Sequence, residues 1–352
     1  MQFASDNWAG VAPEISEALT KAGGQFAEAY GGSAVDQRVD ALFSDVFERS
    51  VSMFFVATGT AANALAISAV SKPGGVVLCH EEAHINVDEC GAIEHLTGGT
   101  RLRGLPGKLC KLAPEVVADE LSGFDPAFVH GGRPVGISIT QATEAGAVYS
   151  VAEVRALAEV AENLGLPLHM DGARFANALV ATEASPAEMT WKAGVDILSF
   201  GATKNGCWCA EALVVFNDDL ASDIRWTRKR AGHLFSKNRF VSVQFEAYLK
   251  DGLWLRLAAH ANGMAARLAD GLSDSNRAQI AARPQGNEVF VWLAPDDIRS
   301  LRARGGSFYE WPDAHYEDAT EMRSAGLQLV RLVTSFATTA DHVDQFVANV
   351  RS

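Results

Sequence analysis

Short apolar runs alternate with amphipathic stretches from the N-terminus to about residue 216. Val51–Ala57 is rich in β-branched and aromatic residues and predicts a buried strand, whereas the Ala-, Leu- and Ile-rich run Ala61–Val70 predicts a helix. Ser150–Leu164 predicts an amphipathic helix, because Ser150 and Glu153 form a capping box at its start. Further strands are predicted at Val76–Cys79, Val135–Thr140, Leu166–Met170, Val195–Phe200 and Ala212–Phe216. This alternation predicts an α/β fold with a mostly parallel sheet and helices on both faces.

The pattern changes in the last third of the chain. The segment from about Asp218 to His260 is helical in character, and a long helix follows it. The remaining predicted elements are strands at Glu288–Leu293, Ser307–Glu310 and Leu329–Val333 and a closing helix near Asp341–Val350. This order predicts a small α+β domain. We expect a large domain at residues 1–250 and a smaller C-terminal domain at residues 251–352.

The stretch Val51–Ser71 contains no charged residue and has about the length of a membrane span. Polar side chains interrupt it, among them Asn63, and hydrocarbon would leave their polar groups unsatisfied. We therefore expect no membrane partner and interpret the stretch as a buried strand, a turn and a buried helix. The turn, Thr58-Gly59-Thr60, has the small residues that direct backbone N–H groups of a helix start toward an anion.

Composition and charge argue against some classes of function. The 352 residues carry a formal net charge of −13, which argues against a nucleic-acid partner, because such a partner requires a positive face. The five cysteines lack the spacing of a disulfide framework, which indicates a reducing compartment. No signal peptide is visible after Met1, so we expect a cytoplasmic protein.

Residues with chemical potential follow the predicted strands, where ligands bind in open α/β sheets. His84 comes shortly after one strand, Asp171 and Arg174 after another, and Lys204 after a third. A lysine in a cleft can form a Schiff base with an aldehyde cofactor, and an aspartate can keep a pyridine nitrogen protonated. Together with the anion-binding turn, these residues indicate a pyridoxal phosphate (PLP) site.

An ordered set of motifs makes the interpretation more specific. The motifs are Phe3–Asn7, Phe55–Asn63, His169–Arg174, Gly201–Gly206 and Val330–Thr334. Over nearly its whole length the chain resembles the low-specificity L-threonine aldolase family, and most closely its bacterial branch, also described as phenylserine aldolases. The resemblance implies PLP dependence and the PLP-dependent transferase fold of type I, in which the N-terminal segment contributes to the active site.

The resemblance also implies residue roles. Lys204 would hold PLP and act in catalysis with His84 and His130, while Asp171 and Arg174 would contact the ring. The other implied cofactor contacts are Gly59, Thr60, His84, Thr203, Arg230 and Lys237. The implied substrate contacts are Ser5, Arg331, Tyr30 and His130.

Three of these residues, Tyr30, Arg230 and Lys237, match positions that reach across a subunit interface in the family. The resemblance therefore implies a homodimer or homotetramer with its active sites at the interface. Two departures from the family pattern stand out. Gly32 and Ser33 replace the two acidic residues that usually follow Tyr-Gly, and Cys207-Trp208-Cys209 is inserted after the lysine.

The implied reaction is retro-aldol cleavage of L-threonine, L-allo-threonine or a related β-hydroxy-α-amino acid such as phenylserine to glycine and an aldehyde. Alternatives on the same fold are a β-eliminating lyase and an aminotransferase, and a cofactor-free binding protein is an alternative of another class. A zinc hydrolase using Cys207, Cys209 and His84 is a further hypothesis, although buried free thiols and no metal are the favoured interpretation. His84 and His130, acting directly or through a water, stay alternatives for the base that accepts the β-hydroxyl proton.

Overall fold

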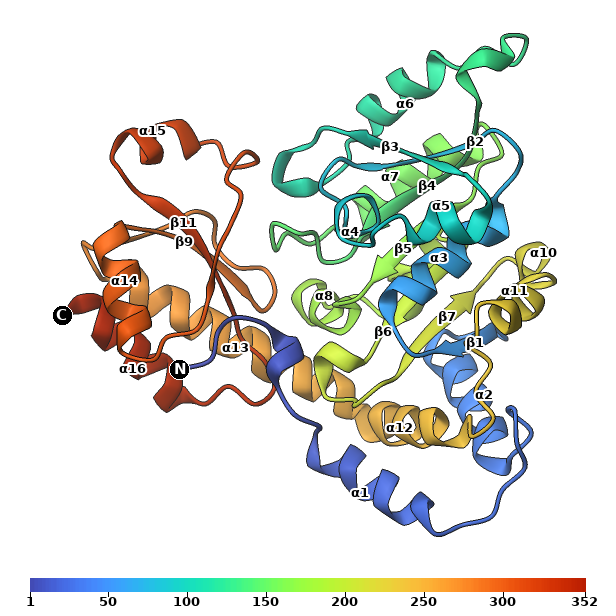
Figure 1. Cartoon of the computed structure of the whole chain (residues 1–352), viewed down its shortest axis with the longest axis horizontal. Coiled ribbons are helices and arrows are strands. Elements are labelled where there is room, and N and C mark those ends of the chain that lie inside the picture. Colours follow the sequence, from blue (N-terminus) through green and yellow to red (C-terminus); the bar gives the residue numbers. More distant parts are fainter.

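The computed structural model describes all 352 residues and contains two separate sheets, which lie in different parts of the molecule (Figure 1). The larger sheet has seven strands in the order β1-β7-β6-β5-β4-β2-β3. These strands are β1 (Ser52–Val56), β2 (Gly75–His80), β3 (Arg101–Leu105), β4 (Arg133–Thr140), β5 (Leu168–Gly172), β6 (Ile197–Gly201) and β7 (Glu211–Val215). Strands β3, β2, β4, β5 and β6 pair in parallel, and β7 runs antiparallel to both β6 and β1. The expected mostly parallel sheet is confirmed.

Helices cover both faces of this sheet, as the strand and helix alternation predicts. Neighbouring residues of a strand point to opposite faces. Ile197 of β6 packs with α3 (Gly59–Val70), while Leu198 joins a second cluster that contains Val154 of α7 (Val151–Glu162). The other helices of this part are α1 (Pro13–Gly23), α2 (Ala34–Val46), α4 (His84–Val87), α5 (Ala92–Thr97), α6 (Pro114–Ser122), α8 (Phe175–Thr182), α9 (Pro186–Met189), α10 (Asp218–Ala221), α11 (Ile224–Arg230) and α12 (Arg239–Leu249).

The smaller sheet is antiparallel, with the order β10-β11-β9-β8. Its strands are β8 (Ala278–Ile280), β9 (Glu288–Leu293), β10 (Tyr309–Glu310) and β11 (Gln328–Val333), and its helices are α14 (Pro295–Ala303), α15 (Ala319–Ser324) and α16 (Ala340–Arg351). The long helix α13 (Leu253–Ser273) contacts α8 of the larger part and α16 of the smaller part. The boundary expected at residue 250 lies just before α13 and stays a prediction.

Two strands were not predicted from the sequence, and each omission has a physical reason. β3 lies at the edge of the large sheet, where Arg101 and Arg103 are exposed and break the apolar run that marks a buried strand. β8 is a three-residue edge strand of the small sheet and is too short for a periodic pattern.

The uncharged stretch Val51–Ser71 folds as expected into β1, a turn and α3. Helix α3 is buried over most of its circumference, which explains why no charged side chain occurs on it. Within it, the Asn63 side chain is buried and polar. None of the helices combines the length and the apolar character needed to cross a bilayer.

Aromatic rings pack behind the end of β6. Phe200 is 1% exposed, and its ring centroid lies 5.5 Å from those of both Phe43 and Trp254. Because Phe200 lies only three residues before the turn Thr203–Asn205 that carries Lys204, this cluster supports the position of that turn from the side of the core.

We expect Phe200→Ala to cost about 3–5 kcal/mol of unfolding free energy, because the substitution leaves a cavity in this aromatic cluster. The midpoint of urea unfolding measures the effect. Phe128→Ala is the control, because Phe128 is 58% exposed and its replacement should leave the midpoint nearly unchanged. Equal midpoints for the two variants would contradict the account of this core.

Candidate active site

Lys204 lies in a single 3-10 turn, Thr203–Asn205, directly after β6. The Asn205 amide anchors this turn by donating to the Tyr248 hydroxyl and the Trp254 carbonyl, both at 2.8 Å. Burial lowers the pKa of the Lys204 amine, and the nearby positive charge of Arg174 lowers this pKa further. A lysine with a lowered pKa holds more of the neutral amine, which is the nucleophilic form.

A chain of hydrogen bonds joins Asp171 to His84. Asp171 is buried at the carboxyl end of β5, and one of its oxygens accepts a hydrogen bond from the Asn63 amide nitrogen at 2.7 Å. The same nitrogen donates to Oε1 of Glu89 at 2.8 Å. His84 Nδ1 lies 2.9 Å from that Glu89 oxygen. Asn63 and Glu89 therefore connect Asp171 with His84. The sequence analysis gave roles to Asp171 and His84 but not to Asn63 and Glu89.

The Glu89 carboxylate influences the pKa of His84. The hydrogen bond to Glu89 raises the pKa of His84, and the nearby Asp171 carboxylate acts in the same direction. Both carboxylates thus shift the ionisation of the His84 ring toward higher pH.

The expected anion site is a helix start with open space. Thr58 caps α3 by accepting the Ala61 N–H at 3.1 Å, and the N–H groups of the first helical turn have no acceptor within the helix. No heavy atom lies within 4 Å of the place where a Cβ on Gly59 would stand. Thr203, from the Lys204 turn, donates its N–H to the buried carboxyl group of Glu211 at 3.3 Å. Burial raises the pKa of Glu211 to about 7.

An alternating row of buried charges joins the N-terminal segment, the large sheet and the small sheet. Arg174 donates from Nε and one terminal nitrogen to the two oxygens of Asp6, at 2.8 and 3.1 Å. Glu288 of β9 lies 3.6 Å from Arg174 and 3.4 Å from Arg331 of β11. Burial alone would raise the pKa of Asp6, but the charges of Arg174 and Lys204 hold this pKa below its usual range.

The Arg331 guanidinium has a donor nitrogen without a hydrogen-bond partner. Its guanidinium carbon lies 3.7 Å from the ring centroid of Trp311, and its Nε is buried without a hydrogen-bond partner. Burial lowers the pKa of this arginine, and the Glu288 carboxylate acts in the opposite direction. Ser5 precedes Asp6 and accepts the N–H of Asn7 at 3.1 Å, so it stands at the same junction.

The structure excludes His130 from the site that this chain builds. His130 is exposed in a 3-10 turn that precedes β4, and its ring packs on Phe128 with centroids 4.8 Å apart. Asp171 and Lys204 lie at the opposite, carboxyl edge of the sheet. At roughly 3.3 Å per residue, the eight residues of β4 separate the two edges by on the order of 25 Å. His130 therefore does not reach the Lys204 site of its own chain, and its role as a substrate-facing base stays a prediction.

The three residues expected at an interface form a group of their own. Tyr30 is 57% exposed, and its N–H donates to the Ser236 carbonyl at 3.0 Å, next to Lys237. Arg230 and Lys237 are exposed, and no hydrogen bond or ion pair joins the three side chains to the Lys204 turn. Their contribution to the site of a neighbouring subunit stays a prediction.

The sequence analysis missed several residues of this region, namely Asp6, Glu89, Glu144, Glu211, Glu288 and Trp311, and gave Asn63 no role. A usable signal exists for some of them. Glu211 and Glu288 each begin a fully buried strand, and Asn63 lies in a helix of Ala, Leu and Ile. A single polar residue at the end or inside such a run is costly to bury and therefore indicates a site.

The structure does not bring together the three residues of the zinc hypothesis. The three side chains whose ligand atoms all lie within 4.8 Å of one another are His80, Cys110 and His315, so Cys207, Cys209 and His84 are not assembled. Cys207 is buried, and Cys209 Sγ lies 3.3 Å from the Ala57 carbonyl oxygen.

We expect Glu89→Gln to lower the pKa of His84 toward or below its ordinary value of 6.5, because the charged acceptor is lost. Histidine NMR in the cofactor-free protein measures it, with His84→Asn to assign the signal. The raised pKa also means that the His84–Glu89 pair stabilises the fold fully below pH 6.5 and loses this contribution as the pH rises through the folded-state pKa. Glu94→Gln, at an exposed position of α5, is the control, and an equal shift in both variants would contradict the pairing.

Comparisons with known proteins agree with this geometry. A model of the beta-eliminating lyase family matches residues 2–296. A low-specificity L-threonine aldolase from Pseudomonas aeruginosa is 42% identical over 308 residues, which cover 88% of each chain. Another protein of that name, from a Pseudomonas species, is 39% identical over 351 residues, covering 100% of this chain and 97% of the relative.

Solved structures give the same answer. The structure of Leishmania major threonine aldolase superposes with a TM-score of 0.90 at 28% identity and covers 99% of this chain and 98% of that one. The residue motifs, the carboxyl-edge site and the sequence and structural matches converge, and the chain belongs to the beta-eliminating lyase family, among the low-specificity L-threonine aldolases.

Proposed function

We propose that this chain binds PLP through Lys204 and catalyses retro-aldol cleavage of β-hydroxy-α-amino acids to glycine and an aldehyde. The observation that carries the proposal is the buried Lys204 amine with its lowered pKa, placed at the sheet edge where Asp171 also ends a strand. The names of the relatives support threonine-type substrates.

The residues present fit the cofactor. The free N–H groups of Gly59 and Thr60 and the open space beside Gly59 suit a phosphate, with Thr203 next to them. The buried Asp171 carboxylate suits a protonated pyridine nitrogen, and Asn63 orients it by a 2.7 Å hydrogen bond. The planar His84 ring, held by its bond to Glu89, suits a place beside the cofactor ring. When bound, PLP would take up the electron pair released at the substrate Cα.

Arg331 is the residue proposed to bind the substrate carboxylate. Its unpartnered Nε and its stacking on Trp311 leave a planar cation preset for an anion, and Ser5 supports the same region from the N-terminal segment. Holding the carboxylate there restricts rotation about the amine–Cα bond, so that the Cα–Cβ bond can be oriented for cleavage. Arg174, paired with Asp6, would contribute positive charge on the ring side.

We further propose a cytoplasmic homodimer or homotetramer in which Tyr30, Arg230 and Lys237 approach a neighbouring subunit's site. Exposed large aromatic side chains support a protein interface, among them Trp8, Phe26, Tyr30, Trp208 and Trp226. The division into a domain of residues 1–250 and one of residues 251–352 belongs to the same proposal.

Lys204→Ala should abolish both the visible absorbance of the lysine-bound cofactor and the release of aldehyde from L-threonine, L-allo-threonine and phenylserine. Spectroscopy and an aldehyde assay on the purified protein with PLP measure the two effects. Lys72→Ala, an exposed lysine, is the control and should keep both. An active Lys204→Ala enzyme would contradict the proposal, and cofactor converted to its amine form by the wild type would indicate an aminotransferase instead.

Arg331→Gln should raise KM and lower kcat/KM by about 10–100-fold, the loss of a charged hydrogen bond of about 1.5–3 kcal/mol. Steady-state kinetics with the substrate that the wild type cleaves best measures this loss. Arg283→Gln removes an exposed arginine whose side chain is 85% exposed and should leave KM unchanged. An Arg331→Gln enzyme with the wild-type KM would exclude Arg331 as the carboxylate partner.

A further inference from the structure

A second carboxyl group stands beside His84. Glu144 lies in the loop that follows β4, and its Oε1 accepts the backbone N–H of His84 at 2.9 Å. Its other oxygen, Oε2, is out of contact with solvent and has no hydrogen-bond partner. The carboxyl group thus has one oxygen that fixes its position and one that no group of the protein occupies.

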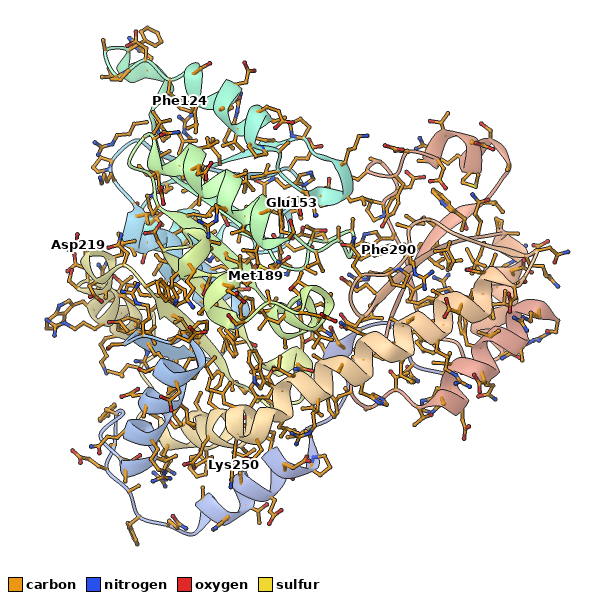
Figure 2. The ribbon with its side chains drawn as sticks, turned by 180° about the vertical axis from the view of Figure 1, so that it is seen from behind. Phe124, Glu153, Met189, Asp219, Lys250 and Phe290 are labelled. Atoms are coloured by element: carbon orange, nitrogen blue, oxygen red, sulfur yellow. The ribbon has the colours of Figure 1, made fainter.

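The small sheet holds the Glu144 loop in place. Gly146 has φ +71°, and a Cβ at this position would lie 2.9 Å from the ring of Phe290 in β9. Phe290 lies at the junction between the two parts of the chain (Figure 2). Thr143 accepts the Ala147 N–H and donates its hydroxyl to the Leu109 carbonyl at 2.8 Å, which closes the loop on the other side.

His84 is less well placed to accept a proton, because its Nδ1 is already engaged by Glu89 at 2.9 Å. His130 lies at the far edge of the sheet. Burial raises the pKa of Glu144 to about 7, and Asp171 adds to this rise, so near neutral pH the group exists in both forms. A base is most effective when its pKa lies near the working pH.

We propose that Glu144 is the catalytic base that accepts the β-hydroxyl proton of the substrate, a role that rests on the proposed function. The O–H bond breaks and its proton passes to the Glu144 carboxylate. The oxygen electrons form the aldehyde carbonyl, the Cα–Cβ bond breaks, and its electron pair stays with Cα. Protonation of Cα then gives glycine, so the step needs no oxidant or reductant.

The groups around Glu144 agree with this role. Asp171 of β5 is an acidic neighbour of Glu144. The thiols of Cys79 and Cys110 and the phenol of Tyr149 also interact with Glu144, and burial raises the pKa of each thiol and of the phenol. Arg174 is the cation whose charge interacts with Glu144. The thiols and the phenol are therefore uncharged near neutral pH, and the ionisable neighbours that influence the charge of Glu144 are Asp171, Arg174 and His84.

The test compares two reactions of the holoenzyme. Cleavage requires loss of the β-hydroxyl proton, whereas exchange of the glycine α-proton with D2O does not. Glu144→Gln should lower the cleavage kcat by about 10²–10⁴-fold, the usual contribution of a general base, and leave glycine exchange within a few-fold of the wild type. Small carboxylates such as formate should restore part of the cleavage in Glu144→Ala.

A cofactor-free measurement accompanies the kinetics. NMR of protein labelled at the glutamate carboxyl carbons should show a group that titrates near pH 7 and disappears in Glu144→Gln. Because ionisation of a carboxyl with a raised pKa costs stability above its unfolded-state value of 4.5, Glu144→Gln should be at least as stable as the wild type at pH 8. Glu211→Gln, which removes the other buried carboxyl with a pKa near 7, is the matched control and should retain the signal of Glu144.

The outcomes separate the alternatives. Equal losses of cleavage and exchange in Glu144→Gln would overturn the base assignment, and so would unchanged cleavage or absent rescue by formate. A wild-type holoenzyme that exchanges the glycine α-proton but releases no aldehyde from any substrate would contradict the proposed function itself, and this inference with it.

Discussion

The buried ion pair between Arg174 and Asp6 is the interaction on which the site depends. A guanidinium in a site closed to water is tolerated only with carboxylate partners, and Arg174 has Asp6 from the N-terminal segment and Glu288 from the small sheet. Three parts of the chain that are distant in sequence therefore meet at one charge. Replacing Asp6 by a neutral residue would therefore have two effects. It would loosen the N-terminal segment, and it would weaken the junction between the two sheets.

The same charge organises the chemistry around it. Arg174 helps to lower the pKa of Lys204, and it faces the row of carboxylates that includes Glu288 and Glu144. Two carboxyl groups of the same site thus differ in their pKa values. Asp6 is held ionised by the cations beside it, whereas burial brings the pKa of Glu144 near 7. Separation of neighbouring pKa values is how one pocket supplies both fixed charge and a mobile proton.

Much of the fold could be predicted from the sequence, because buried parallel strands and amphipathic helices have strong patterns. The capping box at Ser150, the burial of the Val51–Ser71 stretch and the position of Lys204 after a strand were all predictable from local chemistry. The edge strand β3 was not, since its arginines face solvent. The role of His130 rested on the family resemblance alone, and the structure places this residue before β4, at the opposite edge of the sheet from Lys204. The partners of His84 were missed because hydrogen bonds between distant residues leave no local pattern.

The central claim is that the carboxyl edge of the large sheet binds PLP covalently through one lysine. Reduction of the purified protein with borohydride in the presence of PLP, followed by peptide mass spectrometry, tests it most directly, because reduction converts a Schiff base into a stable amine. We expect a single pyridoxyl group on Lys204. A pyridoxyl group on another lysine, or none on a protein that binds PLP, would contradict it.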